Sequence, residues 1–499
     1  MLGTQVNDVE VSIALLTNLL GTDFDIYTLD TRGNGRSTRL GCAASQAEAP
    51  GSASGIEIDS AEWKECYQAF DNQWGTDKEF FSSKAAAIDV AKLIQLINTN
   101  QETYVFGVGF GTLFVSRLMR YIEQKNLKIV KAVAMDSIIS TQGQFGYGGI
   151  FTVTESDEVS NDIGLKFLDL CKDNSTLCAQ KFGDVEPTVY FRNTIQSVYV
   201  NNTCKSVKDA LPESELKSIL AFLMYRTETR VFVPALLYRL NRCDEDLDVA
   251  TILHVRDFYV AKMKSFTSLT TEPMESPVGI TNLVFAELYN TQVTVEQLSE
   301  EYNKTIEIGT GRSIMWAQRL QTTQWKPYTL DAYYYNNTFT ATVPTLLING
   351  ELDPETPLWS AQAQANNIQG SRSLVVLPKS GHMTFFDSPF INGTIPCGMQ
   401  ILINFLNNPD LNTVDTSCAK NIYFNFSGEA SVNEAVMGVS DIYEDAYEAP
   451  EVEKVVSLYL FIGVEAGTVV LSIIIICCLI YYIVQLKDKE QAQYEDLDQ

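Results

Sequence analysis

Short apolar runs alternate with segments of helical periodicity along the first part of the chain. Residues 103–108 and 129–135 are apolar runs of strand length, and residues 24–29 predict a further strand. Residues 83–97 instead repeat their apolar positions every three or four residues, which predicts an amphipathic helix. Strands that alternate with helices indicate the α/β class, with a parallel, doubly wound sheet between layers of helices.

This alternation stops between about residues 152 and 335 and returns with the apolar runs 345–348 and 374–377. Helical patterns replace it. Residues 216–225 have helical spacing, and the helix predicted over residues 295–302 begins with a Thr-x-x-Gln capping box. We therefore expect a mostly helical cap that is inserted over the carboxyl edge of the sheet.

Composition indicates an acidic protein in an oxidising compartment. A hydrophobic content of 45% supports a substantial core, and a formal net charge of -26 argues against binding to nucleic acid or to anionic lipid. Eight cysteines precede residue 420, an even number that favours disulfides. Among the many connectivities open to eight cysteines, we expect sequence neighbours to pair. These pairs are Cys42–Cys66, Cys171–Cys178, Cys204–Cys243 and Cys397–Cys418.

Six Asn-x-Ser/Thr sequons agree with that compartment and predict a glycosylated lumenal or extracellular part. They are Asn174, Asn201, Asn303, Asn336, Asn392 and Asn425. The chain has two histidines and no Cys-x-x-Cys motif, so a zinc site is not expected, and neither is any other metal or cofactor.

A stretch of 19 residues without charge, 466–484, is long enough to span roughly 30 Å as a helix, the thickness of a bilayer core. Lys487 and Lys489 follow it and the preceding flank is acidic, so we expect a single-pass type I protein with a cytosolic C terminus. Gly463 and Gly467 have the Gly-x-x-x-Gly spacing that allows a homodimer of such helices.

The tail contains Tyr494-Glu495-Asp496-Leu497, which resembles a tyrosine-based sorting signal, although so short a pattern also arises by chance. The expected location is the secretory pathway, the cell surface or the endolysosomal system. The chain thus divides into six predicted segments. They are core, first part, 1–151; helical cap, 152–335; core, second part, 336–430; extended acidic stalk, 431–454; transmembrane region, 455–485; and cytosolic tail, 486–499.

Glycines alternate where the strand over residues 103–108 meets the next helical pattern. The residues are Gly107, Val108, Gly109, Phe110 and Gly111, and their spacing is that of a nucleophile elbow. The central position of an elbow carries the nucleophile, and Gly109 has no side chain with which to form an acyl-enzyme. Ser116 lies about two helical turns further on, roughly 10 Å away, and cannot replace it. A dinucleotide-binding loop would need a third glycine where Thr112 or Phe114 stands.

With these motifs, residues 10–420 resemble the α/β-hydrolase serine peptidases of the prolyl iminopeptidase and tripeptidyl aminopeptidase kind. The resemblance rests on the elbow, on residues 30–37 (Asp-Thr-Arg-Gly-Asn-Gly-Arg-Ser), on residues 350–357 and on Ser380-Gly381-His382. It implies an α/β-hydrolase sheet with an inserted cap.

The same resemblance implies that Asp353 is the triad acid and His382 the base. Each follows an apolar strand, so each lies at the carboxyl edge of the sheet, where three loops must converge to form a triad. Glu351 and Glu355 are rivals for the acid, but the register of the motif favours Asp353.

The start of the chain departs from the family. No secretory signal is recognisable in residues 1–20, and no oxyanion loop precedes the helix predicted over residues 9–20. In the family's strand order, the strand before that loop lies between those matching residues 24–29 and 103–108, so we expect a gap in the sheet there. We also expect the natural protein to have an N-terminal part that this sequence lacks.

Because Gly109 stands where the family has a serine nucleophile, two functions are possible. In the first, the chain is an inactive homologue of serine exopeptidases that binds a peptide or protein ligand at its pocket. In the second, the chain is an active aminopeptidase of the prolyl or tripeptidyl type, and the natural protein carries serine at position 109.

Overall fold

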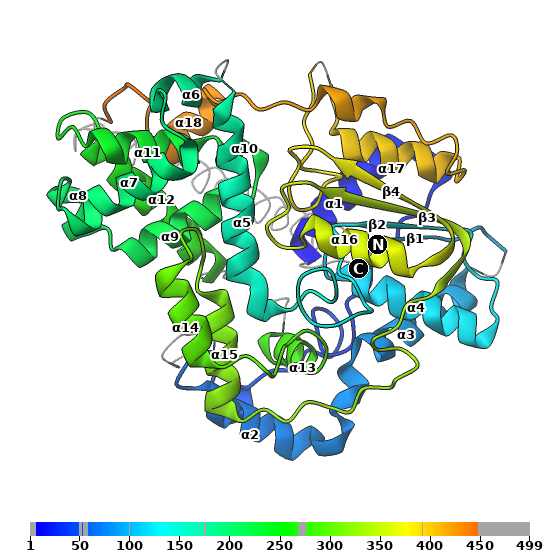
Figure 1. Cartoon of the computed structure of the whole chain (residues 1–499). Helices are drawn as coiled ribbons and strands as arrows, with labels where there is room; N and C mark the ends of the chain where they lie inside the picture. The colour runs from blue at the N-terminus through cyan, green and yellow to red at the C-terminus, as the bar shows by residue number, and fades with distance from the viewer. Residues whose placement is uncertain are drawn as a thin grey trace, which may run out of the picture. The chain divides into compact units, whose positions relative to one another are not determined.

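The computed structural model of the chain describes a core and a helical region (Figure 1). The described residues up to Ala446 form one compact unit. The predicted transmembrane region, Tyr494 and Leu497 lie outside the described residues, and within those residues no helix is long and apolar enough to cross a membrane. The described residues are 6–48, 52, 58–98, 100–173, 176–267, 276–391 and 393–447.

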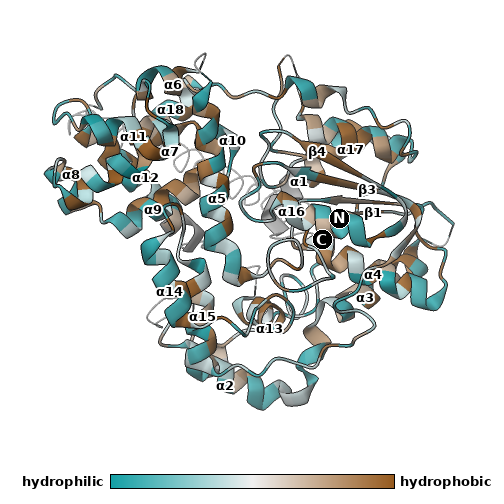
Figure 2. Cartoon of the chain, viewed as in Figure 1, coloured by the Kyte–Doolittle hydropathy of each residue, from teal (hydrophilic) through white to brown (hydrophobic). Residues whose placement is uncertain are grey.

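A parallel sheet of four strands occupies the core. Its strands stand in the order β1 (Tyr104–Val108), β2 (Ala132–Asp136), β3 (Thr340–Gly350) and β4 (Gln369–Leu377). Each neighbouring pair is parallel. Figure 2 shows these strands as largely hydrophobic ribbon between amphipathic helices, as expected for a sheet that is buried on both faces.

The side chains of successive strand residues point to opposite faces of the sheet. Val133 and Met135 of β2 pack with α3 (Ser83–Ile97), α4 (Gly111–Lys125) and α16 (Leu358–Asn367). Ala132 and Ala134 pack with α1 (Val6–Leu20) and α17 (Cys397–Asn407) on the other face. The helix predicted over residues 83–97 and the four strands predicted over residues 103–108, 129–135, 345–348 and 374–377 are therefore confirmed, and each strand differs from prediction in its first or last residues.

Residues 24–29, predicted as a strand, are not part of the sheet. They run beside β1, and the Phe24 ring lies 5.6 Å from that of Tyr104. A cavity of about 580 Å³ separates the two segments, with α1 and α3 contributing apolar walls. The pattern of residues 24–29 favours an extended chain, but within the described sheet β1 pairs with β2 and not with these residues. This cavity is lined by residues from both segments, 23–29 and 101–106.

Between β2 and β3 the described residues form helices, as the pattern predicts (Figure 1). Thr294 and Gln297 make the predicted capping box at the start of α14. One further helix, α2 (Trp63–Trp74), precedes α3. The helices between the strands are α5 (Ser156–Leu168), α6 (Leu177–Phe182), α7 (Pro187–Ile195), α8 (Lys205–Ala210), α9 (Glu213–Leu223), α10 (Thr227–Arg230), α11 (Phe232–Arg242), α12 (Val249–Thr267), α13 (Pro277–Glu287), α14 (Val295–Lys304) and α15 (Arg312–Thr323).

Four disulfides join sequence neighbours, as predicted. Two of them lie within the helical region and one ties α17 to the loop that follows it. The bonds are Cys42–Cys66, Cys171–Cys178, Cys204–Cys243 and Cys397–Cys418.

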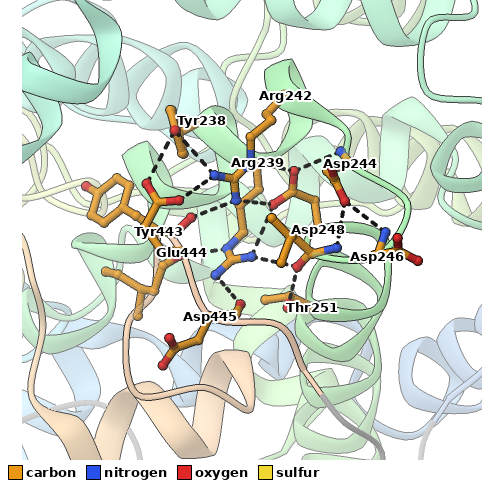
Figure 3. Close-up of polar contacts among 12 residues, drawn as sticks. Tyr238, Arg239, Arg242, Asp244, Asp246, Asp248, Thr251, Tyr443, Glu444 and Asp445 are labelled. Carbon is orange, nitrogen blue, oxygen red and sulfur yellow. Dashed lines mark hydrogen bonds and ion pairs between the residues drawn. The ribbon is translucent and has the colours of Figure 1, made fainter.

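The segment after residue 430 corrects the predicted extended stalk as far as the structure describes it. It forms α18 (Ala430–Met437) and then a strap, residues 438–447, that packs on α11 (Figure 3). Arg239 donates hydrogen bonds to the carbonyls of Ile442 and Asp445, each at 2.7 Å. Tyr443 is 1% exposed. The acidic composition of this segment predicted a solvated chain, but Ile442 and Tyr443 are buried. The Glu444 carboxylate accepts a hydrogen bond from Arg242.

Candidate active site

The chain turns sharply at Gly109, between β1 and α4. Gly109 has φ +53°, its N–H donates to the Asp136 carbonyl at 2.9 Å, and its carbonyl accepts the N–H of Thr112 at 3.0 Å. A Cβ on Gly107 would lie 2.5 Å from Val115 and 2.8 Å from the Gly111 carbonyl, so strand and helix approach too closely for any larger residue. The backbone of residues 107–111 is thus a strand–turn–helix with Gly109 at its apex.

Ser116 lies within the core rather than at this apex. Its hydroxyl is buried, donates to the Thr112 carbonyl at 2.9 Å and accepts from the Gln364 amide at 3.2 Å. These contacts fix the hydroxyl on the body of α4, as the helical spacing predicts.

Asp353 and His382 meet at the carboxyl ends of β3 and β4. The His382 Nδ1 atom lies 3.0 and 3.1 Å from the two carboxylate oxygens of Asp353. Asp353 is fully buried and accepts three further hydrogen bonds, from the Thr356 hydroxyl at 2.7 Å and from the N–H groups of Glu355 and Thr356 at 2.8 Å. The acid is therefore held on several sides, and its contact with Nδ1 leaves Nε2 of His382 as the outward nitrogen.

The contact between Asp353 and His382 shifts the pKa values of both side chains. Burial by itself raises the pKa of Asp353, but the charge and hydrogen bond of His382, with the bonds from Thr356, bring that pKa below its ordinary value. Burial lowers the pKa of His382, yet the charge and hydrogen bond of Asp353 outweigh it and raise that pKa above its ordinary value. The pair therefore favours a charged imidazolium beside a charged carboxylate.

The two rival carboxylates have other partners. Glu351 lies 3.1 Å from Lys166, and Glu355 accepts two hydrogen bonds from Arg312 at 2.6 and 2.8 Å. Asp353 is the member of this trio that contacts His382, as the register of the motif predicts.

The helical region reaches the same edge of the sheet. The ring of Tyr225, which follows α9, lies 6.4 Å from the imidazole of His382, and Arg312 begins α15 beside Glu355. Arg230 of α10 is completely buried and donates to the Lys379 carbonyl at 3.3 Å, within the loop that carries His382. The site is thus assembled from sheet loops and from the helices between β2 and β3.

Sequence reasoning missed three residues of this site. Thr356 shares the carboxylate of Asp353, Arg230 supports the His382 loop, and Asp136 accepts the N–H groups of Thr384 and Phe385. Asp136 had a signal, because it ends a predicted strand at the ligand-binding edge. Arg230 had no such signal in the sequence, because the Lys379 carbonyl that it contacts lies 149 residues further along the chain.

The remaining sequence predictions concern metal binding and the glycosylation sequons. Within the described ranges, no group of three or more His, Cys, Asp or Glu side chains is placed to hold a metal ion. The sequon residues Asn201, Asn303, Asn336 and Asn425 are exposed, whereas Asn174 and Asn392 lie outside the described residues.

Comparison with known proteins gives one family match. The profile of the family described as TAP-like protein matches residues 312–418, which include β3, Asp353, β4 and His382. No curated protein matches the chain in sequence.

Solved structures similar to the chain are distant. They include MGS-M2, an α/β hydrolase from a Medee basin deep-sea metagenome library, at 12% identity over 66% of this chain and 74% of that one, with a TM-score of 0.25. Epoxide hydrolase A from Mycobacterium thermoresistibile is 15% identical over 71% and 75%, with a TM-score of 0.21. Epoxide hydrolase VrEH1 from Vigna radiata is 10% identical over 61% and 71%, also with a TM-score of 0.21.

The order of the strands and of the site residues along the chain identifies the fold. A parallel sheet carries a sharp strand–turn–helix after β1, an aspartate after β3 and a histidine after β4, and the family match covers the last two. The described core therefore has the α/β-hydrolase fold.

Proposed function

We propose that this chain is a catalytically inactive homologue of serine exopeptidases of the prolyl or tripeptidyl aminopeptidase type, and that its site binds a peptide or protein ligand. The observation that carries the proposal is Gly109 at φ +53° on the apex of the turn, in a fold that retains a contacting Asp353–His382 pair. Acyl transfer needs an attacking oxygen on residue 109, and glycine supplies none.

The retained pair is compatible with binding. His382, the half-buried Arg312–Glu355 pair and the Tyr225 ring offer hydrogen bonds, charge and an aromatic face at one edge of the sheet. Such groups suit a peptide, whose backbone and termini carry both donors and acceptors.

The setting of the protein is part of the proposal. The apolar stretch at residues 466–484 anchors a type I protein in the bilayer, with its disulfide-bonded and glycosylated part in the lumen or outside the cell. A cell-surface or endolysosomal location follows from that topology, and a homodimer through Gly463 and Gly467 is consistent with it.

A fluorophosphonate probe tests the inactive state directly, since it labels activated serine nucleophiles. The full chain, in the membranes of expressing cells, should remain unlabelled and should not release reporter groups from amino-terminal di- or tripeptides. Gly109→Ser should gain labelling, while Gly109→Ser combined with His382→Ala should not. Labelling of the unchanged protein would refute the proposal.

The alternative, an active aminopeptidase with serine at position 109, is favoured by the intact Asp353–His382 contact. Reading codon 109 in the natural gene decides between the two. A serine codon there would replace the binding function with peptidase activity, and a glycine codon would exclude the alternative.

A further inference from the structure

We propose that Asp136 is a positioning residue that holds the base loop, residues 379–387, in register with the turn at Gly109. The inference rests on the proposed function in one respect, namely that residue 109 and His382 belong to one site. It goes beyond that function by assigning a role to a buried carboxylate outside the acid–base pair.

Asp136 contacts both parts of the site with different atoms. Its backbone carbonyl accepts the N–H of Gly109 at 2.9 Å. Its carboxylate accepts the N–H of Phe385 at 2.7 Å and the N–H of Thr384 at 3.2 Å. Asp136 is completely buried at the end of β2, so these contacts are shielded from water. One residue thus connects the apex that follows β1 to the loop that follows β4.

Ser137 extends this connection. Its hydroxyl lies 3.1 Å from the Asp136 carboxylate and accepts the N–H of Met383 at 2.8 Å. Ser137 and Met383 both have φ +58°, a left-handed conformation that residues other than glycine rarely adopt. Such conformations persist where the surrounding contacts over-determine them. The three residues after His382 therefore have their N–H groups held by two neighbouring side chains of one strand end.

The charge of Asp136 also reaches His382. Burial raises the pKa of Asp136 to about 6, against the opposing effects of the Phe385, Thr384 and Ser137 hydrogen bonds and of the His382 charge. The carboxylate in turn contributes to the raised pKa of His382, after the larger effects of burial, Asp353 and Glu355. The same group therefore fixes the loop mechanically and acts on the imidazole electrostatically.

Asp136→Asn tests this role, because it keeps the size of the side chain while removing the charge and turning one acceptor into a donor. A donor facing the N–H of Phe385 or Thr384 cannot replace the lost hydrogen bond. The base loop should shift, and His382 should lose part of its proton affinity.

Side-chain NMR of the full chain gives a specific readout, since His254 and His382 are its two histidines. Asp136→Asn should lower the pKa of His382 by about one unit. Asp248→Asn is the matched control, because Asp248 is as completely buried as Asp136, has its own partner in Arg239, and lies in the link between α11 and α12. If Asp136→Asn moves the His382 signal no more than Asp248→Asn does, the assignment is wrong.

Two further arms keep the test decisive. Ser137→Ala removes the bond to Met383 without introducing an unmatched donor, and it should shift the His382 signal even if Asp136→Asn fails to fold. In the Gly109→Ser background, Asp136→Asn should slow fluorophosphonate labelling at least tenfold, measured at a temperature at which the variant remains folded. If Gly109→Ser alone is not labelled, that result bears on the proposed function, and the NMR arm still decides the role of Asp136.

Discussion

The Asp353–His382 contact makes a quantitative prediction about the titration of the imidazole. The Asp353 carboxylate lies 3.0 Å from Nδ1 of His382, is fully buried, and raises the pKa of His382 above the ordinary value of 6.5 despite the opposing effect of burial. Asp353→Asn preserves the shape of the acid but removes its charge. An opposite charge this close typically shifts a pKa by about 1–3 units. We therefore expect the pKa of His382 to fall by about 1–3 units in Asp353→Asn.

The same shift predicts a change in stability. One pKa unit corresponds to about 1.36 kcal/mol, so a contact of this kind stabilises the folded state by about 1–4 kcal/mol where both groups are charged. Because the pKa of His382 is raised on folding, its contribution is fully present below pH 6.5 and is lost as the pH rises through the folded value. Because the pKa of Asp353 is lowered, its contribution is present above pH 3.8 and is lost as the pH falls through the folded value.

Two measurements check this reasoning. Histidine NMR between pH 4 and 9, a range that brackets the ordinary pKa of about 6.5, follows His382 with His254 as an internal reference. Urea unfolding at several pH values measures the stability of the wild type and of Asp353→Asn. The difference between the two proteins should shrink as the pH rises above the folded pKa of His382. A wild-type His382 that titrates at or below 6.5, or a variant whose His382 titrates like the wild type, would refute the electrostatic account.

The remaining predictions concern stability. Gly381→Ala should destabilise the fold by about 1–3 kcal/mol or more, since its Cβ would lie 1.7 Å from Arg230 Nη2; thermal unfolding measures this, and unchanged stability would show that the base loop is free to move. Arg239→Ala should cost about 3–5 kcal/mol, because it leaves the buried Asp248 carboxylate with one partner fewer and several strap carbonyls without a donor. Hydrogen exchange should then accelerate in residues 438–447. Arg192→Ala, at an exposed ion pair with Glu307, should change stability by no more than about 0.5 kcal/mol.

Local pattern predicted much of the core. The apolar runs before Asp136, Asp353 and His382 became β2, β3 and β4. A strand buried on both faces needs a continuous apolar sequence, which holds for β2 and for the end of β3, whereas β4 is mostly half-buried or exposed. The motif register chose Asp353 over Glu351 and Glu355, and the contact with His382 agrees with it. The capping box at Thr294 was equally readable, since its two bonds join residues three apart.

Where prediction failed, the deciding contacts lie far apart in the sequence. Residues 24–29 have a strand-like pattern, but pairing depends on a neighbour that the pattern cannot supply. The strap was predicted as a stalk because acidic residues dominate it, whereas Arg239, 203 residues earlier, donates a hydrogen bond to the carbonyl of Ile442. Arg230 and Asp136 likewise act on a base loop that local periodicity does not connect to them.

The strap also determines where a mechanical load enters the fold. Residues 441–445 are clamped to Arg239 and Arg242, so tension applied at residue 447 passes first into α11. Rupture would begin with the guanidinium–carbonyl bonds, well before force reached the sheet, and the loops bearing Asp353 and His382 would stay intact while the strap peeled away.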